Sequence, residues 1–368
     1  MLADPGHAKS EKDASPVRVL FVCSGSAADG LGHVVRTRTV ANAMDRVADV
    51  EVVGIGGDSV SSLLEGARYP VQVVASIEDA AGFAARSLPD VVVFDMLRAT
   101  PAQFDSIAAH SMTVSLSPIF DRLADVDVLF HRTTSVDPAW TALGDQPLLR
   151  AGLEYAPIDE DCHRISTSAY QATLARRRLS VAVSMGGTDA ANNALRVVDV
   201  LRDCNSQLLL WVLLGEGYEH SYEDLVDRAR GSRHEIILAK TNESMWHILS
   251  TCAVCVLAGG TTTYEAAYAG LPSINLVEMP ERRFVLQELV DGGVSIAVGG
   301  AGDPYAELTG LVEHFDGHRE ELLKMHRNAK HLLGSKGATR IASEILALRR
   351  TIVPRRMTAD TNHGPDHA

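Results

Sequence analysis

The sequence predicts an α/β protein of two lobes, each a parallel β-sheet covered by helices. Its 368 residues exceed one ordinary domain and fit two of roughly 150 to 200 residues. Apolar residues make up 46% and aromatics only 5%, so Ala, Val and Leu must form the core, as is usual in sheets with helices on both faces. Short β-branched runs also alternate with helical patterns, and this alternation starts twice along the chain.

The first lobe begins with a strand expected at residues 17–23, a glycine-rich turn and a helix from about His33 to Met44. Further strands are expected at 50–55, 71–75, 91–95 and 112–116, with helices near 77–87 and 101–109. This βαβ order predicts a parallel sheet with right-handed crossovers.

The second lobe restarts the pattern at 179–184, with strands expected near 207–214, 234–238, 253–257 and 273–276. Helices near 303–315, 317–333 and 336–349 follow, and the pattern leaves open whether the last one packs on the first lobe. The connection between the lobes falls within the proline-containing stretch 132–178. We therefore expect lobes at 16–150 and 151–353, between polar, disordered tails at 1–15 and 354–368.

Charge and composition narrow the class of partner. Lys and Arg total 34 against 47 Asp and Glu, a net charge of −13 without a basic block, so nucleic acid is not an expected partner. No apolar run approaches the roughly 20 residues that span a bilayer. The five cysteines form no regular framework, and the C-x-x-C of Cys252 and Cys255 lies in an apolar run that predicts packing rather than a zinc site. We expect a soluble, cytoplasmic protein with reduced thiols.

The first glycine turn, Ser24-Gly-Ser-Ala-Ala-Asp-Gly-Leu-Gly-His33, lacks the G-x-G-x-x-G spacing of a dinucleotide site. It places His33 in the first turn of a helix at the carboxyl end of a strand, where open α/β sheets bind their ligands. The helix dipole there disfavours imidazolium, so His33 is a candidate general base. The alternative is that His33 only caps or packs the start of the helix.

Two more glycine turns follow in the second lobe. Ser184-Met-Gly-Gly-Thr-Asp189 leads into a helix expected to run through 203, with Thr188 or Asp189 as its N-cap. The free amides there would suit an anion, or the segment is a plain turn in which glycine supplies only the backbone angles. Ala258-Gly-Gly-Thr-Thr-Thr-Tyr-Glu265 opens a helix with three hydroxyls, which would suit a diphosphate. Glu265 would then accept both hydroxyls of a ribose, unless it only stabilises the helix start.

These motifs resemble a known family. Four motifs, in order along the chain, resemble the UDP-2,4-diacetamido-2,4,6-trideoxy-β-L-altropyranose hydrolases, which are grouped with spore-coat polysaccharide proteins. The motifs are Gly30-x-Gly32-His33-x-x-Arg36, Gly152-x-Glu154-Tyr155-Ala156-Pro157, Ser184-x-Gly186-Gly187-x-Asp189, and Ala258-Gly259-Gly260-x-Thr262-x-Tyr264-Glu265 ending in Gly270-x-Pro272. More distantly, the first and third turns are similar to the N-acetylglucosaminyltransferase that completes lipid II, and so to GT-B glycosyltransferases. The resemblance implies two Rossmann-like lobes whose parallel sheets face a central cleft.

The resemblance also implies roles for residues. His33 would be the catalytic base, and nucleotide binding would involve Gly186, Gly187, Thr188, Gly259, Gly260, Thr261, Thr262, Thr263 and Glu265. The sugar side would involve Gly30, Gly32, Arg36, Asp95 and Arg283. Asp95-Met-Leu97, Ser117-Pro-Ile-Phe-Asp121-Arg and Pro280-Glu-Arg-Arg283 depart from the hydrolase pattern and leave the sugar and acceptor open.

The leading functional hypothesis is a UDP-sugar hydrolase that needs neither metal nor cofactor, because helix ends would stabilise the leaving diphosphate. Asp125-Val-Asp127 spells the D-x-D of metal-dependent transferases, but it leads into Val128-Leu-Phe130 and is interpreted as a strand entry. The alternatives are a GT-B glycosyltransferase with a hydroxyl or amine acceptor, a nucleotide-sugar-binding protein that has lost catalysis, and a nucleotide-sugar epimerase.

Overall fold

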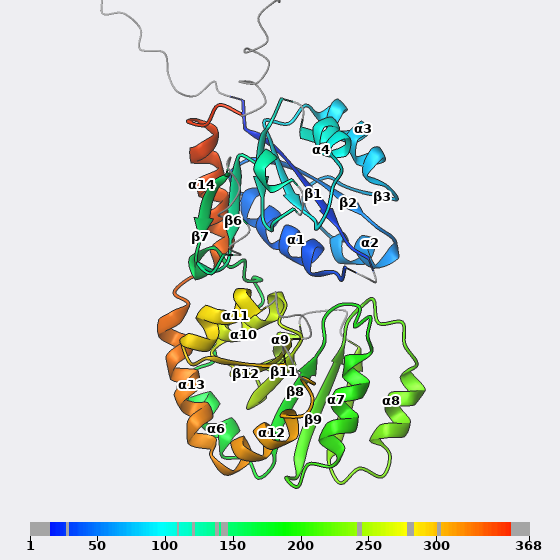
Figure 1. The fold of residues 1–368 in the computed structure, drawn as a ribbon, viewed down its shortest axis with the longest axis vertical. Coiled ribbons are helices and arrows are strands. Elements are labelled where there is room, and N and C mark those ends of the chain that lie inside the picture. The colour runs from blue at the N-terminus through cyan, green and yellow to red at the C-terminus, as the bar shows by residue number, and fades with distance from the viewer. Residues whose placement is uncertain are drawn as a thin grey trace, which may run out of the picture.

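The computed structural model describes residues 15–26, 29–108, 110–119, 122–136, 140, 146–240, 245–277, 283–299 and 303–354. Figure 1 shows two lobes, one above the other, each built around its own sheet. The tails expected to be disordered, 1–15 and 354–368, lie outside the described residues except for Ser15 and Pro354.

The first sheet has seven parallel strands in the order β3-β2-β1-β4-β5-β6-β7. The strands are β1 (Arg18–Ser24), β2 (Asp49–Ile55), β3 (Val71–Val74), β4 (Val91–Asp95), β5 (Met112–Ser115), β6 (Val128–His131) and β7 (Leu148–Ala151). The helices between them are α1 (Gly32–Met44), α2 (Asp58–Leu64), α3 (Ile77–Ser87), α4 (Pro101–Ala108) and the 3₁₀ turn η2 (Leu123–Asp125). The order reverses between β1 and β4, and this reversal is where such sheets bind ligands.

The second sheet has six parallel strands in the order β10-β9-β8-β11-β12-β13. They are β8 (Leu179–Ser184), β9 (Leu208–Leu214), β10 (Glu235–Lys240), β11 (Val254–Leu257), β12 (Ser273–Val277) and β13 (Ser295–Gly299). The remaining helices are η3 (Leu153–Tyr155), α6 (Thr167–Leu174), α7 (Asn193–Arg202), α8 (Tyr222–Ala229), α9 (Trp246–Leu249), α10 (Thr261–Ala269), α11 (Arg283–Asp291), α12 (Leu308–Gly317), α13 (Arg319–Leu332) and α14 (Gly337–Arg349).

Strand alternation explains how the first lobe is layered. Side chains of Phe21 and Cys23 join the apolar core that also contains α1, whereas Leu20 and Val22 join the core under α3 and α4. Every residue of β4 is buried, as expected for a central strand covered on both faces. The prediction of two parallel-sheet lobes is confirmed.

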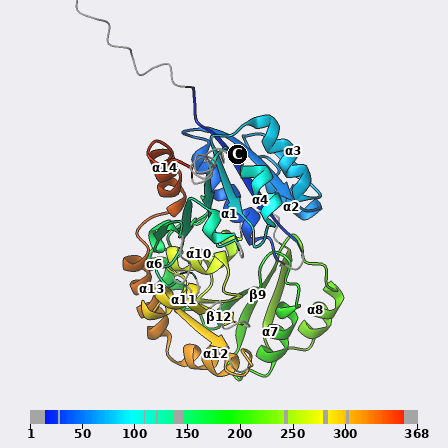
Figure 2. The ribbon, with the colours of Figure 1, turned by 45° about the horizontal axis from the view of Figure 1, so that its top comes forward.

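The last helix returns to the first lobe, which settles the choice that the pattern left open. Ala338, Ile341 and Ile345 of α14 belong to the same apolar core as α1. Glu344 of α14 also accepts hydrogen bonds from Arg150 at 3.0 Å and from the Tyr155 hydroxyl at 2.8 Å. Figures 1 and 2 both show α14 beside the first lobe while α13 stays on the second, so the chain crosses between lobes twice.

Two strands and one motif complete the comparison with the sequence. Strands β7 and β13 were not predicted. The residues of β7 lie in the proline-containing stretch that was assigned to the connection between the lobes. In the structure β7 is the edge strand of the first sheet, and its residues Leu148 and Leu149 are exposed. The five cysteines are free and buried, as expected. In the part of the chain that the structure describes, no helix has the length and apolarity to cross a membrane.

Candidate active site

The first glycine turn places His33 beside a buried carboxylate. β1 pairs with β4, so that Cys23 lies opposite Asp95 and the carboxyl end of β4 is next to the start of α1. Nδ1 of His33 lies 2.6 Å from Oδ1 of Asp95. The Asp95 side chain is fully buried, and only 10% of the His33 side chain is exposed.

Asp95 is held from three directions. Arg36, one turn after His33 on α1, donates from Nε to Oδ2 at 2.7 Å and from its terminal nitrogen to Oδ1. The Ser117 hydroxyl also donates to Oδ1, at 2.9 Å. Burial alone would raise the pKa of Asp95, but Arg36 and His33 outweigh it and hold that pKa well below its usual range. Asp95 is therefore an anion at neutral pH.

The carboxylate fixes the orientation of the imidazole. Arg36 also lies 3.0 Å from Nδ1 of His33, but a guanidinium only donates, so Nδ1 cannot serve both neighbours in one tautomer. The contact with Asp95 is shorter and charge-assisted, which favours Nδ1–H donating to the carboxylate. In that tautomer Nε2 carries a lone pair and can accept a proton.

Arg36 and Asp95, which the resemblance assigned to the sugar side, are only 5% and 0% exposed. Their polar atoms bond to each other and to His33. Both residues were singled out from the sequence for contact with the sugar, but in the structure they bind and orient His33.

The third glycine turn leads from β11 into α10. Gly259 has a φ of +73°, which glycine adopts without strain, and Gly260 is the N-cap. No side chain of the described residues caps α10, and its first turn contains no acidic residue. The first N–H groups of α10, like those of α1, have no cap from a described side chain and can bind an anion.

The three threonines of this turn do not share one environment. Thr261 and Thr262 are partly exposed, but Thr263 is completely buried and donates its hydroxyl to Oδ1 of Asn275 at 2.6 Å. Because Thr263 faces β12, the expectation that its hydroxyl holds a diphosphate is corrected: this hydroxyl is part of the core of the lobe.

Glu265 lies one turn inside α10 and is 4% exposed. Its Oε1 accepts a hydrogen bond from the backbone N–H of Asp159 at 3.3 Å. Burial, together with the nearby Asp159 carboxylate, raises the pKa of Glu265 to about 7. Asp159 comes from the segment between the lobes, and it also pairs with Arg38 of α1 at 3.4 Å.

The second glycine turn is occupied by the protein itself. The Asp189 carboxylate accepts from the backbone N–H groups of Asn193 and Ala194 at 2.7 and 2.8 Å, so it satisfies the start of α7. A Cβ placed on Gly187 would lie 2.9 Å from Cβ of Leu31, which belongs to the first glycine turn. This geometry favours the plain-turn alternative for Gly186, Gly187 and Thr188, with Gly187 packed against the other lobe.

The first and third turns meet across the lobes. A Cβ placed on Gly32 would lie 3.7 Å from Oγ1 of Thr261, so the amino ends of α1 and α10 are neighbours. Figure 1 shows α1 on the side of the first lobe that faces the second, and α10 on the side that faces the first. His33 and the uncapped end of α10 are therefore brought together, while Gly30, with φ +79°, shapes the turn before His33.

Other expected site residues lie apart or outside the described chain. Arg283 is exposed at the first position of α11, and residues 280–282 of its motif lie outside the described residues. In the D-x-D segment, Asp127 accepts from the Thr113 backbone and hydroxyl at 2.7 and 2.9 Å, and Asp125 pairs with Arg122 at 2.8 Å. This segment does enter strand β6, as predicted.

Sequence reasoning missed Asp159 and the pair His131 and Arg132. His131 and Arg132 lie at the carboxyl end of β6. Open α/β sheets bind ligands at the carboxyl ends of their strands, and this is the feature by which the sequence could have indicated the two residues. Burial lowers the pKa of His131 to about 4, and Arg132 and Arg36 add to that effect. His131 is therefore neutral at pH 7.

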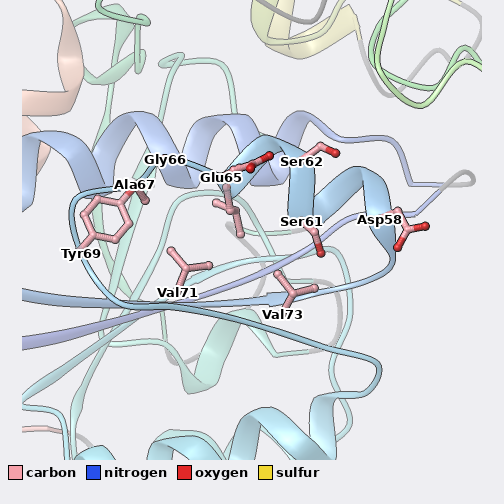
Figure 3. A pocket seen from close by; sticks show the side chains of 10 residues that line it. Asp58, Ser61, Ser62, Glu65, Gly66, Ala67, Tyr69, Val71 and Val73 are labelled. Carbon is pink, nitrogen blue, oxygen red and sulfur yellow. The ribbon is translucent and has the colours of Figure 1, made fainter.

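A groove of about 640 Å³ lies elsewhere on the first lobe. Figure 3 shows that its side chains come from α2, the edge strand β3 and the turn between them, among them Ser61, Tyr69 and Val73. None of the expected site residues lines this groove, so we do not assign the chemistry to it.

Comparison with solved structures identifies the fold. The chain resembles HepE from Anabaena in complex with UDP and glucose, with 16% identity, a TM-score of 0.63 and coverage of 91% of this chain and 100% of the other. It also resembles MurG of Acinetobacter baumannii, with 12% identity, a TM-score of 0.61 and coverage of 90% and 100%. The spinosyn forosaminyltransferase SpnP is similar too, with 14% identity, a TM-score of 0.60 and coverage of 91% and 99%. The chain has the GT-B fold.

Sequence comparisons add little to this GT-B assignment. No protein-family profile matches the chain. An uncharacterized protein of Methanocaldococcus jannaschii is 20% identical over 271 residues, which cover 71% of this chain. The match spans about half (56%) of the length of that relative. At these identities the likeness shows the fold alone.

Proposed function

We propose that the chain is a glycosyltransferase that moves a sugar from a UDP-sugar to a hydroxyl or amine acceptor. One observation carries this proposal: the buried pair of His33 and Asp95 lies in the first lobe, next to the uncapped amino end of α10 in the second. A base and an anion site thus face each other across two lobes. The GT-B neighbours, which include HepE with bound UDP and glucose, support the same class of reaction.

In the proposed reaction, Nε2 of His33 accepts the proton of the acceptor hydroxyl or amine. The acceptor atom then bonds to the anomeric carbon while the bond from that carbon to the diphosphate oxygen breaks. UDP leaves with the electron pair of the broken bond, and the imidazolium that forms is stabilised by the Asp95 carboxylate at 2.6 Å.

The nucleotide is assigned to the second lobe. The amino end of α10, with Gly259, Gly260, Thr261 and Thr262, would face the diphosphate and stabilise the charge that develops on it. Glu265 would accept the ribose hydroxyls in exchange for its contact with the Asp159 backbone. Asp125 and Asp127 already have partners in Arg122 and Thr113, so we assign them no metal-binding role.

A UDP-sugar hydrolase is the second candidate, because the Gly30-x-Gly32-His33-x-x-Arg36 motif resembles those hydrolases and the same dyad would deprotonate water. One assay separates the two candidates. The protein is incubated with a panel of UDP-sugars, and UDP release is followed with and without hydroxyl and amine acceptors.

Release that requires an acceptor supports transfer, and equal release without one supports hydrolysis. UDP binding without any release would identify a binding protein that has lost catalysis. NMR of the products would reveal an epimerase by a changed sugar configuration.

A further inference from the structure

Arg132 is a charged residue between the lobes that the reaction described above does not use. It follows β6 directly, so it extends from the carboxyl edge of the first sheet, the edge that also bears His33 and Asp95. Its guanidinium carbon lies 4.8 Å from the ring centre of Tyr264, which belongs to α10 in the second lobe. Arg132 therefore contacts the helix whose amino end is the candidate anion site.

The position of Tyr264 on α10 tells where the guanidinium lies. Tyr264 comes three residues after Thr261, so the two share a face of the helix about one turn apart. Helical side chains lean toward the amino terminus, and the Tyr264 ring therefore leans over the first turn. The Tyr264 hydroxyl donates to the backbone carbonyl of Val285 in α11, so Arg132 contacts a ring that lies between the first turn of α10 and α11.

The charge of Arg132 has no carboxylate partner within 4.0 Å among the described residues. Two other described arginines, Arg122 and Arg349, share with Arg132 a buried Nε that lacks a hydrogen-bond partner. Those two are paired with Asp125 at 2.8 Å and Asp90 at 3.5 Å. Of this trio only Arg132 thus has no carboxylate partner in the described part of the chain; its Nε is buried, while the residue as a whole is partly exposed.

The carboxylates of Asp95 and Glu288 form no ion pair with Arg132. Burial lowers the pKa of Arg132, and Arg36 lowers it further, although the Tyr264 and Asp95 side chains act in the opposite sense. Asp95 is already bonded to Arg36, His33 and Ser117. Glu288 of α11 accepts from the Thr134 backbone at 2.9 Å with Oε1, and its buried Oε2 has no partner among the described residues.

We infer that Arg132 binds the phosphate of the UDP-sugar that is bonded to the sugar, so that both lobes hold the leaving diphosphate. This inference rests on the proposed function and refines it. A guanidinium offers paired N–H donors that match phosphate oxygens, and its charge offsets the charge that the leaving group gains. The uncapped end of α10 approaches the diphosphate from the second lobe, and Arg132 approaches it from the first.

The test compares the affinities of uridine, UMP and UDP, measured by isothermal titration calorimetry. Arg132→Gln should weaken UDP binding about 10- to 100-fold, the loss expected for a charge-assisted hydrogen bond to phosphate, and should change UMP binding less than about threefold. Arg132→Lys should retain part of the preference for UDP. Arg122→Gln is the matched control, because Arg122 has the same buried Nε but pairs with Asp125; it should leave both affinities unchanged.

Three outcomes overturn the inference. If Arg132→Gln weakens UMP and UDP equally, or neither, Arg132 does not bind the second phosphate. If Arg132→Gln and Glu288→Gln both lower the melting temperature and leave UDP affinity unchanged, Arg132 is a structural partner of Glu288. If the unmodified protein binds none of the three compounds, the proposed function fails together with the inference, whereas the first two outcomes leave nucleotide binding intact.

Discussion

Nδ1 of His33 lies 2.6 Å from Oδ1 of Asp95. His33 is in the first turn of α1, which follows β1, and Asp95 ends the neighbouring strand β4, so the pair lies where the strand order reverses. Because Arg36 and Ser117 bind the same carboxylate, the imidazole has a fixed direction and tautomer. The dyad is thus organised before any ligand binds. A histidine that only capped its helix would not require a buried, charged partner.

Asp95→Asn should lower turnover by about 10²- to 10⁴-fold while UDP affinity changes little, because an amide can no longer hold the imidazolium. The same change leaves Arg36 buried without its counter-ion and should cost about 3 to 5 kcal/mol of unfolding free energy. Steady-state kinetics and urea unfolding measure the two effects on one preparation. Ser117→Ala is the control, since it removes one hydrogen bond and should cost about 1 kcal/mol with the dyad intact.

The raised pKa of Glu265 predicts how stability depends on pH. Its folded pKa of about 7 exceeds the ordinary value of 4.5, so the folded protein binds the proton more tightly than the unfolded chain. This contribution is complete below about pH 4.5 and is lost as the pH rises through 7, by up to about 3 kcal/mol. Glu265→Gln should remove that dependence in unfolding experiments from pH 5 to 8. An unchanged pH profile would show that Glu265 does not titrate in this range.

Asp159 links the candidate ribose site to α1, and Asp159→Asn should act on both. The carboxylate raises the pKa of Glu265, so its removal should lower that pKa toward the ordinary value, measured by carboxyl-carbon NMR. The lost pair with Arg38 is partly exposed and should cost less than about 1 kcal/mol. Arg46→Gln, which breaks the exposed pair with Glu160 beside it, should leave the pKa of Glu265 unchanged.

The contact of Leu31 with Gly187 predicts a steric clash between the lobes. Gly187→Ala would place its Cβ 2.9 Å from that of Leu31 and should lower the unfolding free energy by about 1 to 3 kcal/mol. Leu31→Gly removes the Cβ that would clash, so combining Leu31→Gly with Gly187→Ala should cost less than the sum of the two single changes. Full additivity in the double-mutant cycle would mean that the two residues do not touch in solution.

Local patterns were enough to predict the two sheets and the turn that carries His33. In each lobe a strand, a glycine turn and a helix follow one another within about 20 residues, so their order can be recognised from the sequence. The role of Asp95 could not be predicted, since it lies 62 positions from His33 and reaches it only through the pairing of β1 with β4. The burial of the Thr263 hydroxyl could not be predicted either, because its partner Asn275 lies on β12 and depends on how α10 packs against the sheet.

The contacts between the lobes could not be predicted from the sequence. Leu31 meets Gly187, Arg132 meets Tyr264, and Asp159 meets both Glu265 and Arg38 only once the lobes are placed together. None of these contacts has a spacing in the chain that would single it out. The domain boundaries of 16–150 and 151–353 stay a prediction, and α14 of the second range packs on the first lobe.

The most direct test of the account measures UDP binding and UDP release for the unmodified protein and for His33→Ala, with a UDP-sugar and an acceptor found in the panel assay. We predict that His33→Ala binds UDP within about threefold of the unmodified protein and releases UDP at least about 100-fold more slowly. Equal rates of UDP release from both proteins would contradict the assignment of His33 as the base.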